Sequence, residues 1–337
     1  MNNHTKLKEI ANQLTCKGKG ILAADESNPT CTKRFDSIGI ESNFDTRNEY
    51  RDLLLTTEGI EQYISGVILF DETLRQNTTG DKNTPFPKFL NSKGIIPGIK
   101  VDKGAKVLEN SNQEKITEGL DGLDERLAEY YKLGARFAKW RAVITIGDKI
   151  PTDACLNANA HALARYAAKC QQAGMVPIVE PEILMDGTHT IEDCNEVTKK
   201  TLEIVFNQLD LQNVLLEGII LKPNMIISAI DCDTRADINT VAKMTYECLL
   251  SHVPNKVPGI AFLSGGQTGD EATSHLCKMN EKYMNNMPWN LTFSYGRALQ
   301  QDALNTWLGK IENKESAQKV FIQRAKNNSL ATFGKTE

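Results

Sequence analysis

Short apolar runs alternate with helical segments along almost the whole sequence, and this alternation restricts the fold more than any other feature. Each run is typical of a buried strand and is followed by helical spacing or by a loop that leads to it. No linker divides the series. The eight predicted strands are residues 20–25, 66–70, 97–101, 135–141, 176–182, 215–222, 259–263 and 291–296.

Alternating strands and helices predict a parallel sheet, and eight such units predict closure into a (β/α)8 barrel. The alternative, an open doubly wound sheet, normally carries a GxGxxG nucleotide loop after its first strand, and none follows residues 20–25. We therefore expect an α/β TIM barrel in a single domain over residues 1–327, with a short polar tail over 328–337. Expected helices lie at 5–16, 47–63, 86–92, 121–133, 153–173, 192–208, 234–251, 269–285 and 315–327, with another from Arg297 through Leu308.

The composition argues against several classes of protein. Charged residues make up 24% of the chain and the net charge is −4, so no basic surface for nucleic acid or acidic membranes is indicated. No apolar run approaches the roughly 18 residues of a membrane span. The polar start over residues 1–9 is unlike a signal peptide. We expect a cytoplasmic protein that binds neither nucleic acid nor membranes.

Cysteine and histidine usage gives no sign of a disulfide framework or a metal centre. The eight cysteines include no CxxC pair, which is typical of reduced thiols in the cytosol. None of the histidines lies at a predicted strand end or shares metal-ligand spacing with another. They are His4, His161, His189, His252 and His275. We expect neither a metal nor a cofactor.

Charged and hydroxyl side chains collect at the C-terminal ends of the predicted strands, where barrel enzymes have their active sites. The candidates are Asp25, Lys100, Lys139, Arg141, Glu180, Glu182, Lys222, Ser264 and Arg297. Side chains two apart on a strand point the same way, so Lys139 and Arg141 should share a face, as should Glu180 and Glu182. Any one of them could be an ordinary exposed strand end, but the complete set favours catalysis.

Several lysines at neighbouring strand ends predict carbonyl chemistry. Burial and nearby cations lower the pKa of an amine, which can then attack a carbonyl and form a Schiff base. Nearby carboxylates can move protons while the carbinolamine forms and breaks down. These residues alone do not distinguish Lys222 from Lys139 or Lys100 as the nucleophile.

Two glycine-containing loops predict a phosphate site. Ser264-Gly265-Gly266 follows the seventh strand and Tyr295-Gly296-Arg297 follows the eighth. Glycines let backbone N–H groups approach an anion, a following helix presents its positive end, and arginine adds a charged fork. Tight turns explain either loop alone, whereas the two together favour phosphate, because barrels commonly bind it there.

These stretches resemble the motifs of class I, or Schiff-base, fructose-1,6-bisphosphate aldolases. The matching segments are GILAADES at 20–27, PGIKVDKG at 97–104, FAKWR at 137–141, PIVEPEIL at 177–184, LKPNM at 221–225, FLSGGQ at 262–267 and TFSYGRALQ at 292–300. They occur in the same order along nearly the whole chain, so the resemblance is far more specific than a single motif.

The resemblance implies a metal-independent barrel enzyme, usually a homotetramer, that reversibly cleaves fructose 1,6-bisphosphate in glycolysis and gluconeogenesis. The products would be dihydroxyacetone phosphate and glyceraldehyde 3-phosphate. It implies that Lys222 forms the imine and that Glu180 shuttles protons with support from Glu182. Asp25 would take the proton from the hydroxyl at the bond being cleaved, and Lys139 would hold the charge states of the acids.

The resemblance also assigns residues to the two ends of the substrate. The ketone-side phosphate would be held by Ser264, Gly265, Gly266, Ser294, Gly296 and Arg297. Ser27, Arg34 and Lys100 would hold the other end, and Arg141 completes the expected substrate-binding set.

Two departures from the family pattern leave parts of this assignment open. Animal-type members have Gly-Ser where this chain has Pro29 and Thr30, and the stiffer backbone puts contacts to the far phosphate in doubt. Those members also end in a mobile tail whose tyrosine assists enamine protonation, whereas this sequence ends at residues 334–337 with GKTE. Another group performs that step, or the step is slower, or the sequence is truncated. The remaining alternatives are a barrel acting on another sugar phosphate and a binding scaffold with vestigial chemistry.

Overall fold

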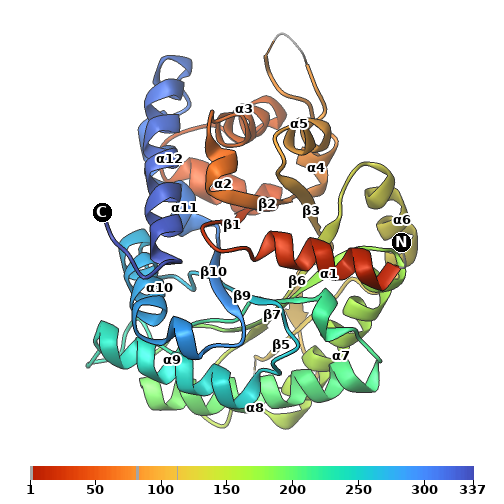
Figure 1. Ribbon diagram of the computed structural model, residues 1–337, viewed down its shortest axis with the longest axis vertical. Coiled ribbons are helices and arrows are strands. Elements are labelled where there is room, and N and C mark those ends of the chain that lie inside the picture. The colour runs from red at the N-terminus through yellow and green to blue at the C-terminus, as the bar shows by residue number, and fades with distance from the viewer. Residues whose placement is uncertain (1–2, 81–82, 112) are drawn as a thin grey trace.

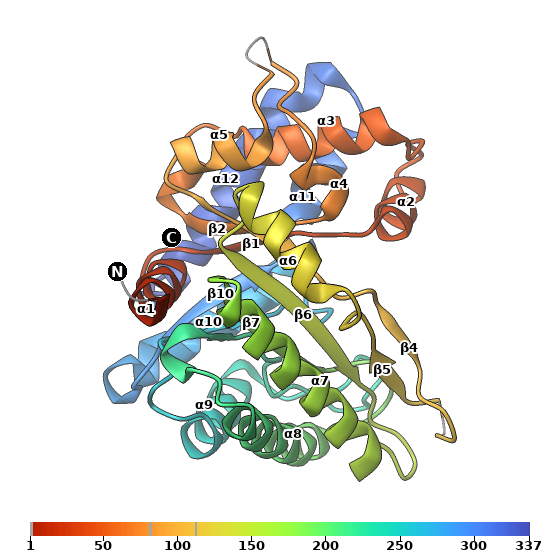
Figure 2. The ribbon, with the colours of Figure 1, turned by 90° about the vertical axis from the view of Figure 1, so that its right-hand side faces the viewer.

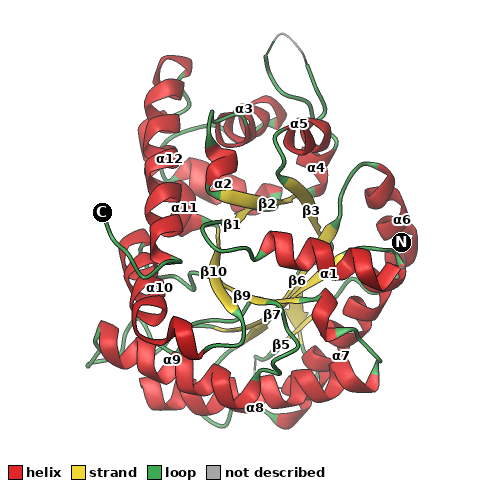
Figure 3. Cartoon of the chain, in the orientation of Figure 1, coloured by secondary structure: helices red, strands yellow, loops and turns green. Residues whose placement is uncertain are grey.

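The computed structural model describes residues 3–80, 83–111 and 113–337. A closed barrel of parallel strands, in the order β1-β10-β9-β8-β7-β6-β3-β2, lies at its centre (Figure 1, Figure 3). The strands are β1 (Gly20–Ala24), β2 (Ile64–Leu69), β3 (Ile96–Lys100), β6 (Phe137–Ile144), β7 (Val176–Ile183), β8 (Ile220–Leu221), β9 (Gly259–Phe262) and β10 (Asn290–Tyr295). The predicted (β/α)8 barrel is confirmed.

Helices surround the barrel (Figure 3). They are α2 (Asn28–Asp36), α3 (Phe44–Leu55), α4 (Asp71–Leu74), α5 (Phe86–Ser92), α6 (Leu123–Lys132), α7 (Asp153–Gln172), α8 (Ile191–Leu211), α9 (Ile238–His252), α10 (Gly269–Tyr283), α11 (Arg297–Trp307) and α12 (Lys314–Ala331). In the described part of the chain, no helix combines the length and apolar character that crossing a membrane requires.

The interior of the barrel is apolar toward its N-terminal end. Helix α1 (Asn3–Leu14) closes this end, with Leu7 and Leu14 in one buried cluster with Phe137 of β6. The Phe137 ring needs a glycine at position 98, because a Cβ there would lie 2.3 Å from the ring. Since side chains alternate along β6, the inward row that begins at Phe137 continues with Lys139, nearer the other end. The inward-facing side chains thus change from apolar at the N-terminal end of the barrel to charged at the other end.

The sixth predicted strand was too long. Residues Leu216–Gly218 form a short 3-10 helix, and β8 itself is only Ile220–Leu221. The side chain of Gln171 from α7 hydrogen-bonds the backbone N–H and C=O of Leu215, and a further bond reaches the carbonyl of Gly218. A side chain on a distant helix therefore satisfies backbone groups that the apolar sequence pattern assigned to the sheet.

The sequence pattern also missed several short elements and misplaced some ends. Helix α2 begins with Pro29 in its first turn, where proline fits a helix, so this residue starts a helix rather than stiffening a loop. The predicted loop at 102–119 contains a hairpin of β4 (Ala105–Val107) and β5 (Lys115–Thr117), which lies beside β6 in Figure 2. Helix α3 ends at Leu55, well before 63, and α12 continues past 327 to Ala331.

Candidate active site

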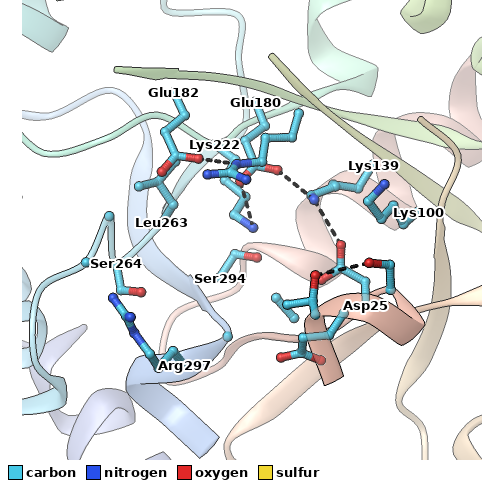
Figure 4. Close-up of a pocket in the computed structure, with 18 of the residues that line it drawn as sticks. Asp25, Lys100, Lys139, Glu180, Glu182, Lys222, Leu263, Ser264, Ser294 and Arg297 are labelled. Carbon is cyan, nitrogen blue, oxygen red and sulfur yellow. Dashed lines mark hydrogen bonds and ion pairs between the residues drawn. The ribbon is translucent and has the colours of Figure 1, made fainter. Parts of the chain in front are cut away.

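A cavity of about 540 Å³ lies at the C-terminal ends of the barrel strands (Figure 4). The strand ends, the loops that follow them and helix α2 supply its walls. Every residue that the sequence assigned to the site lines this one cavity: Asp25, Ser27, Arg34, Lys100, Lys139, Arg141, Glu180, Glu182, Lys222, Ser264, Gly265, Gly266, Ser294, Gly296 and Arg297.

Lys139 lies between two carboxylates at the base of the cavity. Its Nζ is 2.9 Å from Oδ2 of Asp25 and 3.3 Å from Oε2 of Glu180 (Figure 4). All three side chains are almost completely buried. As predicted, Lys139 and Arg141 share one face of β6, and Glu180 and Glu182 share one face of β7. Across the two strands, Lys139 pairs with Glu180 and Arg141 pairs with Glu182.

These contacts fix the charges of Lys139 and Asp25. Burial alone would lower the pKa of Lys139, but the carboxylates of Asp25 and Glu180 outweigh burial and raise this pKa far above its ordinary value. Burial alone would raise the pKa of Asp25, but the charge of Lys139, followed by that of Lys222, holds this pKa well below its usual range. At neutral pH, Lys139 is therefore an ammonium group and Asp25 is a carboxylate.

Lys222 follows β8 directly, and only 3% of the residue is exposed. Its Nζ lies 3.1 Å from Oε1 of Glu180, so Glu180 contacts Lys222 with one oxygen and Lys139 with the other. The amine of Lys222 and the carboxylate of Asp25 thus lie on either side of the Lys139–Glu180 pair. A ketone in the cavity would meet an amine, a proton carrier and a separate base in one buried place.

Lys100, the third candidate amine, has a different environment at the end of β3. Its Nζ donates to the backbone carbonyl of Asp102, at 3.0 Å, and to the side-chain carboxylate of the same residue. Asp102 also accepts hydrogen bonds from the backbone N–H groups of Gly104 and Arg141. Asp102 does not line the cavity, so its carboxylate contacts Lys100 and backbone N–H groups and does not face the substrate space.

Arg141 and Glu182 pair one step further along β6 and β7. The Arg141 Nε donates to Oε2 of Glu182, and Glu182 is buried whereas Arg141 is partly exposed. Burial alone would lower the pKa of Arg141, but the Glu182 carboxylate raises it above its ordinary value. A fixed positive charge therefore lies above the Lys139–Glu180 pair, where it can meet an anionic substrate.

The two glycine-containing loops form the opposite wall. Gly265 and Gly266 have left-handed φ values of +56° and +84°, and a Cβ on Gly266 would lie 2.6 Å from Sδ of Met185. Helix α11 begins at Arg297, so its positive end faces this wall. Ser294 on β10 is buried, and its hydroxyl oxygen has no hydrogen-bond partner in the described residues. The wall therefore presents unpaired donors and positive charge toward the cavity, as an oxyanion ligand requires.

The sequence analysis missed Glu26, which lines the cavity next to Asp25. Its carboxylate lies 2.6 Å from Arg34 of α2 and 2.7 Å from the buried Arg51 of α3, and it accepts a hydrogen bond from Gln300. Although burial would raise the pKa of Glu26, these arginines lower it. A second acid in GILAADES was visible in the sequence, but its partners lie on other helices. Thr30, Lys33, Ser37 and Gln301 are further lining residues that were not assigned.

Comparison with known proteins gives a consistent result across the chain. A family described as fructose-bisphosphate aldolase class-I matches residues 6–337. The probable fructose-bisphosphate aldolase class 1 of Xylella fastidiosa (strain 9a5c) is 56% identical over 331 residues, which cover 98% of each chain. The fructose-bisphosphate aldolase of Plasmodium falciparum is 51% identical over 332 residues, or 98% of this chain and 89% of that protein.

A solved structure agrees with these relatives. It contains the Plasmodium falciparum fructose-bisphosphate aldolase in a complex with TRAP and a small-molecule inhibitor. The TM-score is 0.97 at 50% identity, over 100% of this chain and 96% of that chain. The resemblance found in the sequence motifs is confirmed. On this combination of barrel, strand-end site and full-length similarity, the chain belongs to the class I fructose-bisphosphate aldolase family, whose members cleave their substrate through a Schiff base without a metal.

Proposed function

We propose that Lys222 is the amine that forms the Schiff base when this aldolase cleaves fructose 1,6-bisphosphate. The observation that carries the assignment is the 3.1 Å contact between Lys222 Nζ and Glu180 Oε1 inside the cavity. Lys139 is held as an ammonium group between two carboxylates, and Lys100 is paired with an acid that does not line the cavity. Among the described residues, Lys222 contacts one carboxylate, that of Glu180, which lines the cavity, whereas Lys139 lies between two.

Imine formation needs two proton transfers, and we assign both to Glu180. As the Lys222 nitrogen bonds to the ketone carbon, Glu180 takes a proton from the nitrogen. It then returns a proton to the carbinolamine hydroxyl, which leaves as water while the C=N bond forms. Lys139 stays a charged ammonium group 3.3 Å from Glu180 during these transfers.

Asp25 acts as the general base in cleavage of the carbon–carbon bond. Its carboxylate takes the proton from the hydroxyl next to the bond being broken, and that oxygen becomes the carbonyl of the departing aldehyde. The bonding electrons move into the protonated imine and leave an enamine on Lys222. Because the pKa of Asp25 is held low by Lys139, Asp25 is ionised and ready to accept this proton.

The two phosphates would bind at opposite sides of the cavity. The loop Ser264–Gly266, Ser294, Gly296 and Arg297 would hold the ketone-side phosphate, and Ser27, Arg34, Lys100 and Arg141 the other end of the sugar. The left-handed glycines, the start of α11 and the Ser294 hydroxyl, which has no partner among the described residues, support the first assignment. Thr30 lies 3.0 Å from Ser27 through their hydroxyl oxygens, so it retains a hydroxyl on the second side.

Steady-state cleavage of fructose 1,6-bisphosphate, followed by coupled detection of triose phosphates, tests the assignment. Lys222→Ala should reduce cleavage to the background rate. Lys33→Ala is the matched control, because Lys33 lines the same cavity from α2 yet is exposed and takes no part in the ion pairs that join Asp25, Lys139, Glu180 and Lys222. The control should change the KM and leave the kcat near that of the wild type. Unchanged cleavage by Lys222→Ala would reject the assignment.

We also propose that the protein is a cytoplasmic homotetramer whose small-molecule partners are a sugar bisphosphate and triose phosphates. The tetramer is supported only by the family resemblance, and sedimentation velocity at several concentrations would test it. The cytoplasmic location is supported by the cysteines, all eight of which are free thiols, most of them buried. Fractionation of the source cells would test the location.

A further inference from the structure

The backbone of the loop Ser264–Gly266 is braced by one side chain, that of Gln267. The carbonyl oxygen of Ser264 accepts a hydrogen bond from the Gln267 backbone N–H, at 3.0 Å, and another from its Nε2, at 2.8 Å. Over residues 3–80, 83–111 and 113–337, the three loop residues make no other hydrogen bond. Two successive left-handed glycines offer little resistance to rearrangement, so the position of this loop depends on that brace.

The Gln267 side chain is itself fixed at its other end. Gln267 is 2% exposed, and its Oε1 lies 2.6 Å from Nδ1 of His275 on α10. Because Nε2 must donate to the Ser264 carbonyl, Oε1 is the acceptor, and Nδ1 of His275 carries the proton. Reversing the amide would put two acceptors against each other. His275 is also buried, and burial lowers its pKa to about 4, so the ring is neutral at neutral pH.

We propose that Gln267 is a positioning residue for the ketone-side phosphate, and that His275 holds its amide in the orientation that braces Ser264. The inference rests on the proposed assignment of that phosphate to the loop Ser264–Gly266. Gln267 does not line the cavity, so it acts through the loop and not by touching the substrate. Its effect is therefore confined to the part of the substrate that carries the phosphate.

A pair of trapping substrates isolates this effect. Borohydride trapping on Lys222 is measured against concentration for dihydroxyacetone phosphate and for dihydroxyacetone, which lacks the phosphate. Gln267→Met removes the side-chain hydrogen bonds to Ser264 and His275, and the long one to Sδ of Met225, at similar volume. We expect the half-saturating concentration of dihydroxyacetone phosphate to rise about tenfold, the value for one lost hydrogen bond. The value for dihydroxyacetone and the trapping rate at saturation should stay as in the wild type.

Two further variants separate positioning from a general loss of stability. Asn280→Leu is the matched control, because Asn280 is also a 2% exposed amide and donates to the carbonyls of Leu276, Leu291 and Ala331, away from the loop. It should lower the thermal midpoint without changing the preference for the phosphorylated compound. His275→Phe keeps a ring but removes the donor, and should reduce that preference less than Gln267→Met does.

The outcomes distinguish the inference from its premise. A wild-type preference for dihydroxyacetone phosphate that Gln267→Met and His275→Phe leave intact would overturn the positioning role. Equal losses for both compounds would also overturn it. A wild-type enzyme that traps both compounds equally well would overturn the phosphate assignment itself.

Discussion

The ammonium nitrogen of Lys139 lies 2.9 Å from the carboxylate oxygen Oδ2 of Asp25, and both residues are buried. The second carboxylate on Lys139, that of Glu180, reaches Lys222 with its other oxygen. The four side chains form one chain of alternating acidic and basic groups across the base of the cavity. A buried ion of this kind is stable only while each charge has its partner, so removing one member affects the others.

Replacement of Lys139 by Met should damage both stability and chemistry. It leaves the carboxylates of Asp25 and Glu180 buried without their shared cation, which should lower the free energy of unfolding by about 3 kcal/mol. The pKa of Asp25 should rise because the charge that outweighs burial is gone. Cleavage should fall by about 100-fold or more, as expected for a disturbed general base. Urea denaturation and the pH–rate profile of cleavage measure the two effects.

Lys169→Met is the control for that variant, since Lys169 pairs with the exposed Asp124 on the outside of the barrel. A pair of this kind contributes at most about 1 kcal/mol, so this variant should retain the stability and pH–rate profile of the wild type. An acid limb in Lys139→Met that matches the wild type would show that Lys139 does not set the ionisation of Asp25.

Replacement of Asp25 by Asn should separate the two halves of the reaction. The amide cannot accept the proton of the hydroxyl, so cleavage of fructose 1,6-bisphosphate should fall by about 10²- to 10⁴-fold. Lys222 and Glu180 keep their 3.1 Å contact, so borohydride should still trap dihydroxyacetone phosphate on the enzyme. Intact-protein mass spectrometry after reduction measures the adduct. Loss of the adduct together with cleavage would place Asp25 in imine formation instead.

Replacement of Gly266 by Ala should weaken binding of the phosphate. Alanine at a φ of +84° costs about 1 kcal/mol in strain, and the added Cβ would lie 2.6 Å from Sδ of Met185. Gly94 is the matched control, because it has a φ of +73° and open space around the added carbon, far from the cavity. Both variants should lose stability, but only Gly266→Ala should raise the KM. Equal KM values would mean that the loop does not bind substrate.

Because of His275, the free energy of unfolding should fall in mild acid. Burial, together with Arg235, lowers its pKa to about 4, although Glu271 acts in the opposite direction. Because this lies below the unfolded value near 6.5, the unfolded chain takes up a proton first as the pH falls. Stability is then lost from about pH 6.5 downward until about pH 4, and the loss between pH 7.5 and pH 5 should be about 2 kcal/mol.

Denaturant unfolding of the wild type and of His275→Phe at both pH values measures this contribution. The phenylalanine ring does not titrate, so the variant should lose about 2 kcal/mol less than the wild type over that interval. An equal loss in the two proteins would assign the acid sensitivity to other groups.

The alternation of apolar runs was sufficient to predict the barrel, because parallel strands buried on both faces leave a strong sequence signal. Strand ends then predicted the site, since a barrel brings its C-terminal strand ends to one face. Elements with little apolar surface were missed: α2 buries only Cys31 and Phe35, and β4 is wholly exposed. Periodicity cannot detect a helix or strand that buries so little.

Ion pairs between side chains far apart in the sequence could not be predicted from the residues alone. No residue near Glu26 in the sequence predicts its ion pair with Arg51, which lies on another helix, and only the family resemblance related Lys139 to its two carboxylates. The two carboxylates nevertheless fix the charge of Lys139. The residues alone left three candidate amines, and both the family resemblance and the contacts in the folded protein favour Lys222.

The most direct test is to locate the covalent adduct. Borohydride reduction with dihydroxyacetone phosphate, followed by peptide mapping, identifies the lysine that attacked the ketone. We expect a modification on Lys222 alone in the wild type and no adduct in Lys222→Ala. An adduct on Lys139 or Lys100 in the wild type would contradict it.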